Sequence, residues 1–182
     1  AWNTVAGNLN RTVACSDATA LAAAMALIPV ATDACDADVS DIVKTSLAFV
    51  PSAGCSQSGS YTNTWVVTDA CGNTSSTYTQ VITITDNTPP TWTTAAGALN
   101  RSVDCSDAAG LAAAQALKPL AVDLCDGNVT NVVKVSGAFA AGSCGNRGTF
   151  TNTWTVADDC GNVSTVYTQV ITLTDNVAPV WL

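Results

Sequence analysis

The segment 62–73 reads TNTWVVTDACGN, and the segment 151–162 reads TNTWTVADDCGN. In the first segment Asn63, Trp65 and Val67 alternate with threonine and valine, which is the two-residue period of a half-buried strand. The aspartate, cysteine, glycine and asparagine that follow are typical of a turn. Each half of the chain is therefore predicted to contain a strand that ends in a cysteine-bearing turn.

The similarity between the halves extends over the whole chain, so the sequence is a tandem repeat. Segments 9–13, 15–18 and 78–83 return as 99–103, 105–108 and 167–172. We expect a first repeat over residues 1–88, a second over 89–178 and the start of a third over 179–182. This organisation indicates a piece of a longer array.

The hydrophobic pattern within a repeat predicts short strands and one helix. Strands are expected at 9–13, 39–47, 61–68, 77–85 and 129–137. In the last of these, Val129, Val133 and Val135 are expected to face inward. Segment 17–28 is expected to be a helix, because its alanines and larger apolar residues recur at helical spacing before a proline. These elements predict a mostly β fold of two immunoglobulin-like sandwiches, each with one short Ala-rich helix.

The composition narrows the choice of partners. All 14 acidic residues are Asp, Lys and Arg together number 6, His is absent, and the formal net charge is -8. Nothing is left for a basic groove that binds phosphates, so nucleic acid is excluded as a partner. No run approaches the roughly 20 apolar residues of a membrane helix, so the chain is not expected to be membrane-embedded. Arg11 and Lys44, with their counterparts Arg101 and Lys134, are expected to pair with neighbouring aspartates.

The cysteines fall as four per repeat: Cys15, Cys35, Cys55, Cys71, Cys105, Cys125, Cys144 and Cys160. An even number at repeated spacing is typical of a disulfide framework. A catalytic cysteine would have no histidine base, and a zinc site would have neither histidine nor a C-x-x-C pair. We therefore predict two disulfides in each repeat, with a four-cysteine metal site as the alternative.

Strand geometry ranks the possible pairings. Cys55 and Cys71 flank the strand 61–68. The ends of this strand lie roughly 20 Å or more apart, whereas a disulfide needs Cα atoms within about 7 Å. The loops that contain Cys35 and Cys71 have closely matching tetrapeptides and are expected at the same end of a sandwich. The predicted disulfides are Cys15–Cys55, Cys35–Cys71, Cys105–Cys144 and Cys125–Cys160.

A known family shares the motifs CSDA at 15–18, ATDACD at 31–36, TNTW at 62–65, TDACGN at 68–73 and DNTPP at 86–90. In combination they resemble the hyalin-repeat-like, immunoglobulin-like tandem modules of very large surface proteins in gliding Bacteroidota. The resemblance implies a filamentous extracellular adhesin, exported by type IX secretion, that serves surface attachment and gliding motility. Through its parent protein it would be associated with the outer membrane. Its partners would be neighbouring repeats and surface polysaccharide or abiotic surfaces.

Aspartates provide the candidate metal site, and calcium is the cofactor considered. Asp33, Asp36, Asp38 and Asp69 are expected near one end of the first repeat, and Asp86 lies in the linker. Oxygen ligands from loops at a domain junction suit calcium. The alternative is that these aspartates form turns by accepting hydrogen bonds from nearby backbone amides, since no loop has the spacing of a known calcium motif.

The tryptophans divide into two groups. Trp65 and Trp154 alternate with their strands and are expected in the core. The residues expected to pack between successive repeats are Trp2, Trp92, Trp181, Pro89 and Pro90. The leading hypothesis is a disulfide-stapled spacer in an extracellular stalk. The alternative is a carbohydrate-binding module in which tryptophans stack on glycans, whereas no general base or paired carboxylates support an enzyme.

Overall fold

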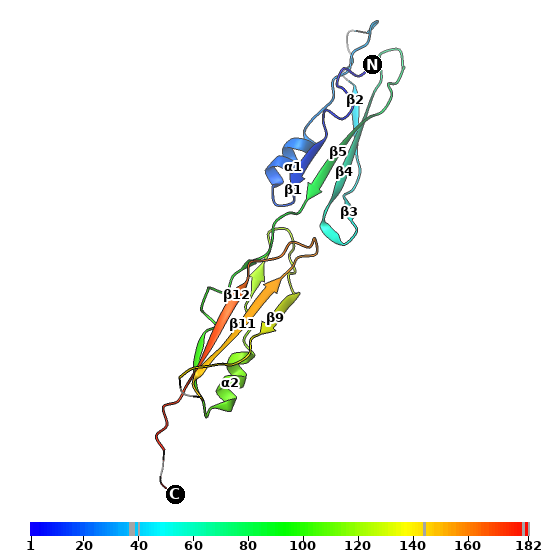
Figure 1. Cartoon of the computed structure of the whole chain (residues 1–182). Helices are drawn as coiled ribbons and strands as arrows, with labels where there is room; N and C mark the ends of the chain where they lie inside the picture. The colour runs from blue at the N-terminus through cyan, green and yellow to red at the C-terminus, as the bar shows by residue number, and fades with distance from the viewer. Residues whose placement is uncertain (37–38, 40, 144, 180, 182) are drawn as a thin grey trace. The chain divides into compact units, whose positions relative to one another are not determined.

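The computed structural model of the chain describes residues 1–36, 39, 41–143, 145–179 and 181. Its contacts divide the chain into two compact units, Ala1–Asn87 and Thr88–Leu182, which we call repeat 1 and repeat 2. Each unit is mostly β with one short helix, as the sequence predicts (Figure 1). Among the described residues, no helix is long and apolar enough to cross a membrane.

Repeat 1 contains one principal sheet and one helix. Its elements are β1 (Arg11–Ala14), α1 (Ala18–Met25), β2 (Ile42–Ser46), β3 (Val50–Ser52), β4 (Cys55–Val67) and β5 (Tyr78–Thr85). The strand order is β1-β5-β4-β2, and β3 also pairs with β4. Neighbouring strands are antiparallel except β1 and β5, which run parallel. The first and last strands of the repeat therefore lie side by side.

Repeat 2 reproduces this sheet and adds a short second one. Its elements are β6 (Thr91–Trp92), β7 (Arg101–Asp104), α2 (Ala108–Gln115), β8 (Ala121–Val122), β9 (Val132–Ser136), β10 (Ala140–Ala141), β11 (Gly148–Val156) and β12 (Tyr167–Thr174). β7 is parallel to β12, and β11 is antiparallel to β9, β10 and β12. β6 pairs with β8 in the small second sheet, where repeat 1 has a bridge between Trp2 and Ala31.

The core of each repeat lies on one face of the principal sheet. In repeat 1 Trp65, Tyr78 and Ile82 are 1%, 4% and 0% exposed, and α1 adds Ala24 to the same side. The residues that alternate with this buried set on β5, such as Thr79 and Val81, are exposed or half-buried. Trp65 and its counterpart Trp154, which is 2% exposed, confirm the prediction that these two rings belong to the core. Removing such apolar surface from water stabilises the fold by about 25 cal/mol per Å².

The helix of repeat 1 begins where the sequence predicts and ends earlier. Asp17 caps it, because its Oδ1 accepts a hydrogen bond from the backbone N of Ala20 at 2.8 Å. The last helical residue is Met25, whereas the pattern predicts a helix over 17–28. Beyond Met25 the chain turns toward Pro29, which is fully buried and cannot donate a helical hydrogen bond.

A buried pair of amide side chains joins the sheet to the helix and to the first loop. Asn63 and Gln80 are both 0% exposed, and Asn63 Nδ2 donates to Gln80 Oε1 at 2.9 Å. Gln80 Nε2 donates to the carbonyl oxygens of Leu9 at 2.6 Å and Ala24 at 3.0 Å. The same bonds recur in repeat 2. Because an unpartnered buried polar group costs about 1–3 kcal/mol, this network favours one position of the helix on the sheet.

The strand β9 presents its valines to solvent, contrary to the prediction. Val133 and Val135 are 59% and 62% exposed, and Val129 lies before the strand. Lys134 takes the inward position, with its Nζ 5.3 Å from the centroid of the Trp154 ring. The apolar stem of lysine covers the aromatic ring while its charge stays near water, which a simple alternation of apolar and polar residues does not reveal.

Candidate functional site

Two turns at one end of each repeat bring together the aspartates and cysteines of interest. They are segments 32–36 and 68–73 in repeat 1 and segments 122–126 and 157–162 in repeat 2, and we call each pair a turn pole. In the first turn, Asp33 Oδ1 accepts hydrogen bonds from the backbone N of Cys35 at 2.8 Å and of Asp36 at 3.2 Å. Asp123 makes the same two bonds in repeat 2. The aspartates therefore shape the turns, as the turn-forming alternative predicts.

The second turn follows β4 directly. Asp69 Oδ1 accepts from the backbone N of Cys71 at 3.0 Å and of Asn73 at 2.7 Å, and Asp69 Oδ2 accepts from Asn73 Nδ2 at 2.8 Å. The bonds from Asn73, its side chain first, hold the pKa of Asp69 below its ordinary value of 3.8. Gly72 has a φ of 87°, a left-handed conformation that explains why glycine follows the cysteine.

A hydrogen bond joins the two turns of each pole. In repeat 1 Asp36 Oδ2 accepts from the backbone N of Ala70 at 2.8 Å. The equivalent bond in repeat 2 runs from the backbone N of Asp159 to Asp126 Oδ2 at 3.3 Å. The two cysteine-bearing loops therefore meet at one end of the repeat, where the sequence places them.

The cysteines of the two turn poles are in different states. Cys125 and Cys160 are disulfide-bonded in repeat 2, whereas Cys35 and Cys71 are exposed free thiols in repeat 1. The predicted Cys35–Cys71 disulfide is therefore not formed in this structure. The turns of repeat 1 are held together by the bond between Asp36 and the backbone, which does not require the two sulfur atoms to meet.

Among the described residues, Cys15, Cys55 and Cys105 lie at the opposite ends of their repeats, with Cys15 and Cys105 next to β1 and β7 and Cys55 at the start of β4. Cys15 and Cys55, predicted as a pair, are both disulfide-bonded. For the predicted Cys105–Cys144 disulfide, Cys144 lies outside the described residues. That pairing stays a prediction.

Basic side chains bind carbonyl oxygens rather than the aspartates expected from the sequence. Arg11 Nη1 donates to the carbonyl oxygens of Asn8 at 3.0 Å and Asn10 at 2.6 Å. Lys44 Nζ donates to the carbonyl oxygen of Met25, at the end of α1, at 2.5 Å. A cation near the carboxyl end of a helix is favoured by the helix dipole and by the carbonyls left without an intrahelical partner.

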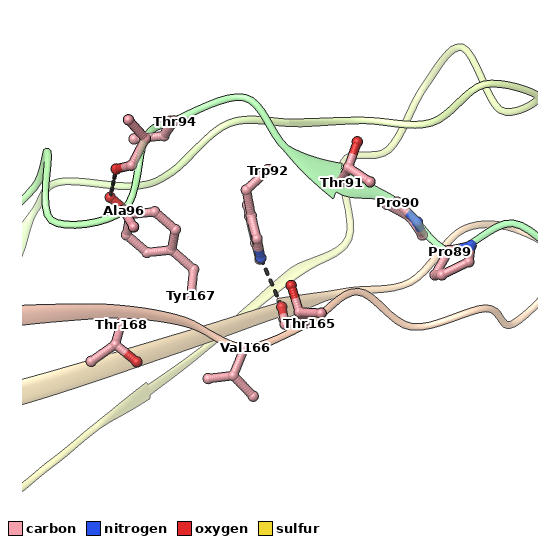
Figure 2. A pocket seen from close by; sticks show the side chains of 11 residues that line it. Pro89, Pro90, Thr91, Trp92, Thr94, Ala96, Thr165, Val166, Tyr167 and Thr168 are labelled. Atoms are coloured by element: carbon pink, nitrogen blue, oxygen red, sulfur yellow. Dashed lines mark hydrogen bonds between the residues drawn. The ribbon is translucent and has the colours of Figure 1, made fainter.

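Trp2 and Trp92 contact their own repeats, whereas Trp181 is fully exposed. The Trp2 ring lies 5.7 Å from that of Tyr78, and its Nε1 donates to the carbonyl oxygen of Ser76 at 2.6 Å. Trp92 lies 5.6 Å from Tyr167, and its Nε1 donates to the carbonyl oxygen of Thr165 at 2.7 Å (Figure 2). Packing between successive repeats stays a prediction for Trp2, Trp92, Trp181, Pro89 and Pro90.

Trp92 also lines a pocket of about 550 Å³ in repeat 2. Its other lining residues include Pro89, Pro90, Thr91, Thr165 and Thr168. Figure 2 shows Thr165 beside the indole. The pocket thus combines flat apolar rings with hydroxyl groups. Sequence reasoning placed this tryptophan at a junction and did not predict the pocket.

The model of HYR-like domains with four cysteines matches residues 3–84 and 93–173. The chain belongs to this family. Each HYR-like match falls within one of the two compact units, and each matched segment contains four cysteines, the number in the family description.

Two solved structures of cadherin domains also align with the HYR-like repeats. Human protocadherin-24 EC1-2, form II, is 12% identical, with a TM-score of 0.34 over 97% of this chain and 100% of that chain. Mouse clustered PcdhgC3 EC1-3 is 10% identical, with a TM-score of 0.35 over 96% of this chain and 67% of that chain. No curated protein sequence matches the chain.

The predicted calcium ligands of the first HYR-like repeat lie at two separate places. Asp33, Asp36 and Asp69 meet at the turn pole, where their oxygens accept backbone hydrogen bonds. Asp86 is buried after the end of β5, beside the start of β4. The two ends of β4 lie roughly 30 Å or more apart, so Asp86 does not join the other three within repeat 1. Asp38 lies outside the described residues.

The second HYR-like repeat holds an aspartate pair that the sequence-based ligand set omits. Carboxylate oxygens of Asp123 and Asp158 lie within 4.8 Å of each other. Asp123 Oδ2 is buried without a hydrogen-bond partner, and Asp158 is 6% exposed. The repeat pattern in the sequence could have predicted this pair, because Asp123 and Asp158 occupy the positions of Asp33 and Asp69. Two such carboxylates offer the oxygen ligands that calcium prefers.

Proposed function

We propose that these HYR-like repeats form a spacer segment in the stalk of a large extracellular adhesin. The observation that carries the proposal is structural duplication. The principal sheet, the amide network, the capped helix and the turn pole of repeat 1 all recur in repeat 2. In a tandem array each copy folds around its own core, so the length of a stalk can grow by addition of copies.

The cysteine chemistry and the motifs support a place outside the cell. Disulfides persist in oxidising compartments and are rare in the cytosol. The motif resemblance supports a parent protein that acts at the cell surface of gliding Bacteroidota, in surface attachment and gliding motility after type IX secretion. In this role the repeats set the distance between the cell and the adhesive part of the parent protein.

An in-frame deletion of both repeats from the parent gene tests the spacer role. We expect cells that carry the deletion to display the shortened adhesin, detected by antibody on intact cells, and to keep attaching to surfaces and gliding. The purified two-repeat fragment should bind no ligand on a glycan array. Loss of attachment with normal surface display would instead assign ligand binding to these repeats and overturn the spacer role.

Carbohydrate recognition is the second candidate, and the pocket beside Trp92 is the observation that favours it. Its volume of about 550 Å³ falls within the roughly 300–1,000 Å³ of small-molecule sites. Proline and tryptophan rings with nearby threonine hydroxyls can contact both the flat face and the hydroxyl groups of a sugar. If the fragment binds a glycan, we expect Thr91→Arg to abolish the binding without changing the melting temperature. That result would support this candidate. Ala1→Arg, at the matching position of repeat 1, is the control.

A further inference from the structure

The principal sheet has a second face, opposite the core, that is open to solvent in both repeats. We call it the outer face. In repeat 1 it is represented by Val43, Thr45, Thr64, Val66, Thr79 and Val81. In repeat 2 the same positions are Val133, Val135, Thr153, Thr155, Thr168 and Val170. Three of these valines, Val43, Val133 and Val135, are 60%, 59% and 62% exposed.

Strand register arranges these side chains in rows. In repeat 1 Thr64 lies opposite Thr45 on one side and Thr79 on the other. The corresponding row of repeat 2 is Val135, Thr153 and Thr168. β-branched side chains in cross-strand rows give a continuous surface of the kind that packs against another sheet.

The positions named above carry no charge in a strongly acidic protein, whereas Asp104 on the edge strand β7 alternates with the buried Val103 and so faces the same side as they do. The chain has 14 acidic residues and a net charge of -8, yet the twelve positions named above are all threonine or valine. Two copies that approached through aspartate-rich surfaces would repel each other. The outer face is therefore a surface through which a second copy can approach without that repulsion.

Differences between the repeats show which property of this face is kept. Thr45 corresponds to Val135, and Val66 corresponds to Thr155. Each exchange keeps the β-branched shape of the side chain and replaces a hydroxyl group with a methyl group or the reverse. A ligand recognised through an array of hydroxyls would lose contacts at these positions, whereas a packed sheet needs shape and neutrality.

From these observations we propose that the outer face is a docking surface for the outer face of a second copy of this chain. The two sheets pack face to face at about 10 Å, with β-branched side chains interdigitating. The contact is isologous, because the same surface serves both partners. It associates stalks laterally and is independent of what the parent adhesin binds.

Sedimentation equilibrium of the 182-residue chain tests this contact. We expect the weight-average mass to rise from monomer toward dimer as the concentration increases from the micromolar to the millimolar range. A protein that stays monomeric throughout would overturn the proposal and leave the outer face as ordinary strand surface.

The double variant Thr64→Lys with Thr153→Lys places a charge at the centre of both outer faces. We expect its association constant to fall by about tenfold or more, because like charges then meet across the contact. Ala22→Lys with Ala112→Lys makes the same change in net charge on exposed helix positions and should associate like the wild type. An equal fall in the association constant of both double variants would show an effect of net charge and contradict the proposal. Thr79→Lys with Thr168→Lys provides a second test if circular dichroism shows that the first variant is unfolded.

Discussion

The turn poles of the two repeats share a hydrogen-bonded backbone and differ in their cysteines. Asp33 and Asp123 form the same turn, and one aspartate oxygen joins the two turns in each repeat. Only repeat 2 has disulfide-bonded cysteines at this pole. The comparison teaches that aspartate hydrogen bonds set the shape of the pole, and that a disulfide adds stability to a shape already formed.

The largest effect concerns the independence of the two repeats. Trp65→Ala and Trp154→Ala each remove a ring that is 1% or 2% exposed. We expect each to destabilise its own repeat by about 3–5 kcal/mol and to leave the other unchanged. Calorimetry should then show that only one of two unfolding transitions moves. A single transition that moves equally in both variants would contradict separate cores.

Removal of the cysteines tests the difference between the poles directly. Cys125→Ser with Cys160→Ser should cost repeat 2 about 2–4 kcal/mol, since the unfolded chain loses its cross-links. Cys35→Ser with Cys71→Ser should change the stability of repeat 1 by less than about 0.5 kcal/mol. In the unreduced wild type, iodoacetamide should label Cys35 and Cys71 and spare Cys125 and Cys160. Labelling followed by peptide mapping measures this, and protection of Cys35 would show that the first pole also closes.

A reciprocal exchange tests the helix end that lies over the amide network. In repeat 2, Asn152 Nδ2 donates to Gln115 Oε1 at 2.8 Å. The counterpart of Gln115 in repeat 1 is Met25, whose Sδ lies 3.4 Å from Asn63 Nδ2. We expect Met25→Gln to stabilise repeat 1, and Gln115→Met to destabilise repeat 2, by about 0.5–1.5 kcal/mol each. Urea denaturation of the two variants gives both values. If both variants change the free energy of unfolding in the same direction, side-chain packing rather than the hydrogen bond determines the stability at this position.

Acid should weaken repeat 1 through Asp69. Its folded pKa is lowered from 3.8 by hydrogen bonds from Asn73, so the carboxylate contributes stability above 3.8, and this contribution is lost as pH falls through the lowered pKa. Asp69→Asn should therefore lower the melting temperature at neutral pH and flatten its decline between about pH 5 and pH 2. An acid profile parallel to that of the wild type would exclude Asp69 as a contributor.

Calcium removal should have the smallest effect. Because the oxygens of Asp33, Asp36 and Asp69 already accept backbone hydrogen bonds, we expect a chelator to leave the melting temperature of repeat 1 unchanged. Repeat 2 is the sensitive case, since Asp123 Oδ2 has no hydrogen-bond partner. A chelator effect confined to repeat 2, and removed by Asp123→Asn, would assign calcium to the Asp123 and Asp158 pair.

Much of the fold follows from local patterns in the sequence. Alternation around Trp65 predicts the central strand, Asp17 predicts the start of the helix, and the repeat predicts that both halves fold alike. The position of the glycine after each turn cysteine also follows, because Gly72 and Gly161 both have a φ of 87°.

Other features depend on tertiary contacts that a linear pattern does not contain. Lys134 faces inward because a tryptophan ring and a helix end lie beneath it, so Val133 and Val135 turn outward. The polar residues Asn63 and Gln80 sit at inward positions because each provides the other's hydrogen-bond partner. The difference between the poles is not visible in the sequence either, since both repeats have cysteines at the same positions.

The parallel pairing of β1 with β5 determines how a repeat responds to mechanical tension. The chain enters this pair of strands at the amino end of β1 and leaves it at the carboxyl end of β5. The register runs from Arg11 opposite Ile82 to Ala14 opposite Thr85, so the entry and the exit lie at opposite ends of the ladder. A pull on the chain therefore acts along the strands and loads every hydrogen bond of the ladder at once, instead of opening them one after another. Repeat 2 has the same geometry between β7 and β12. A repeat with this geometry therefore resists tension along the chain by shear of its terminal strands.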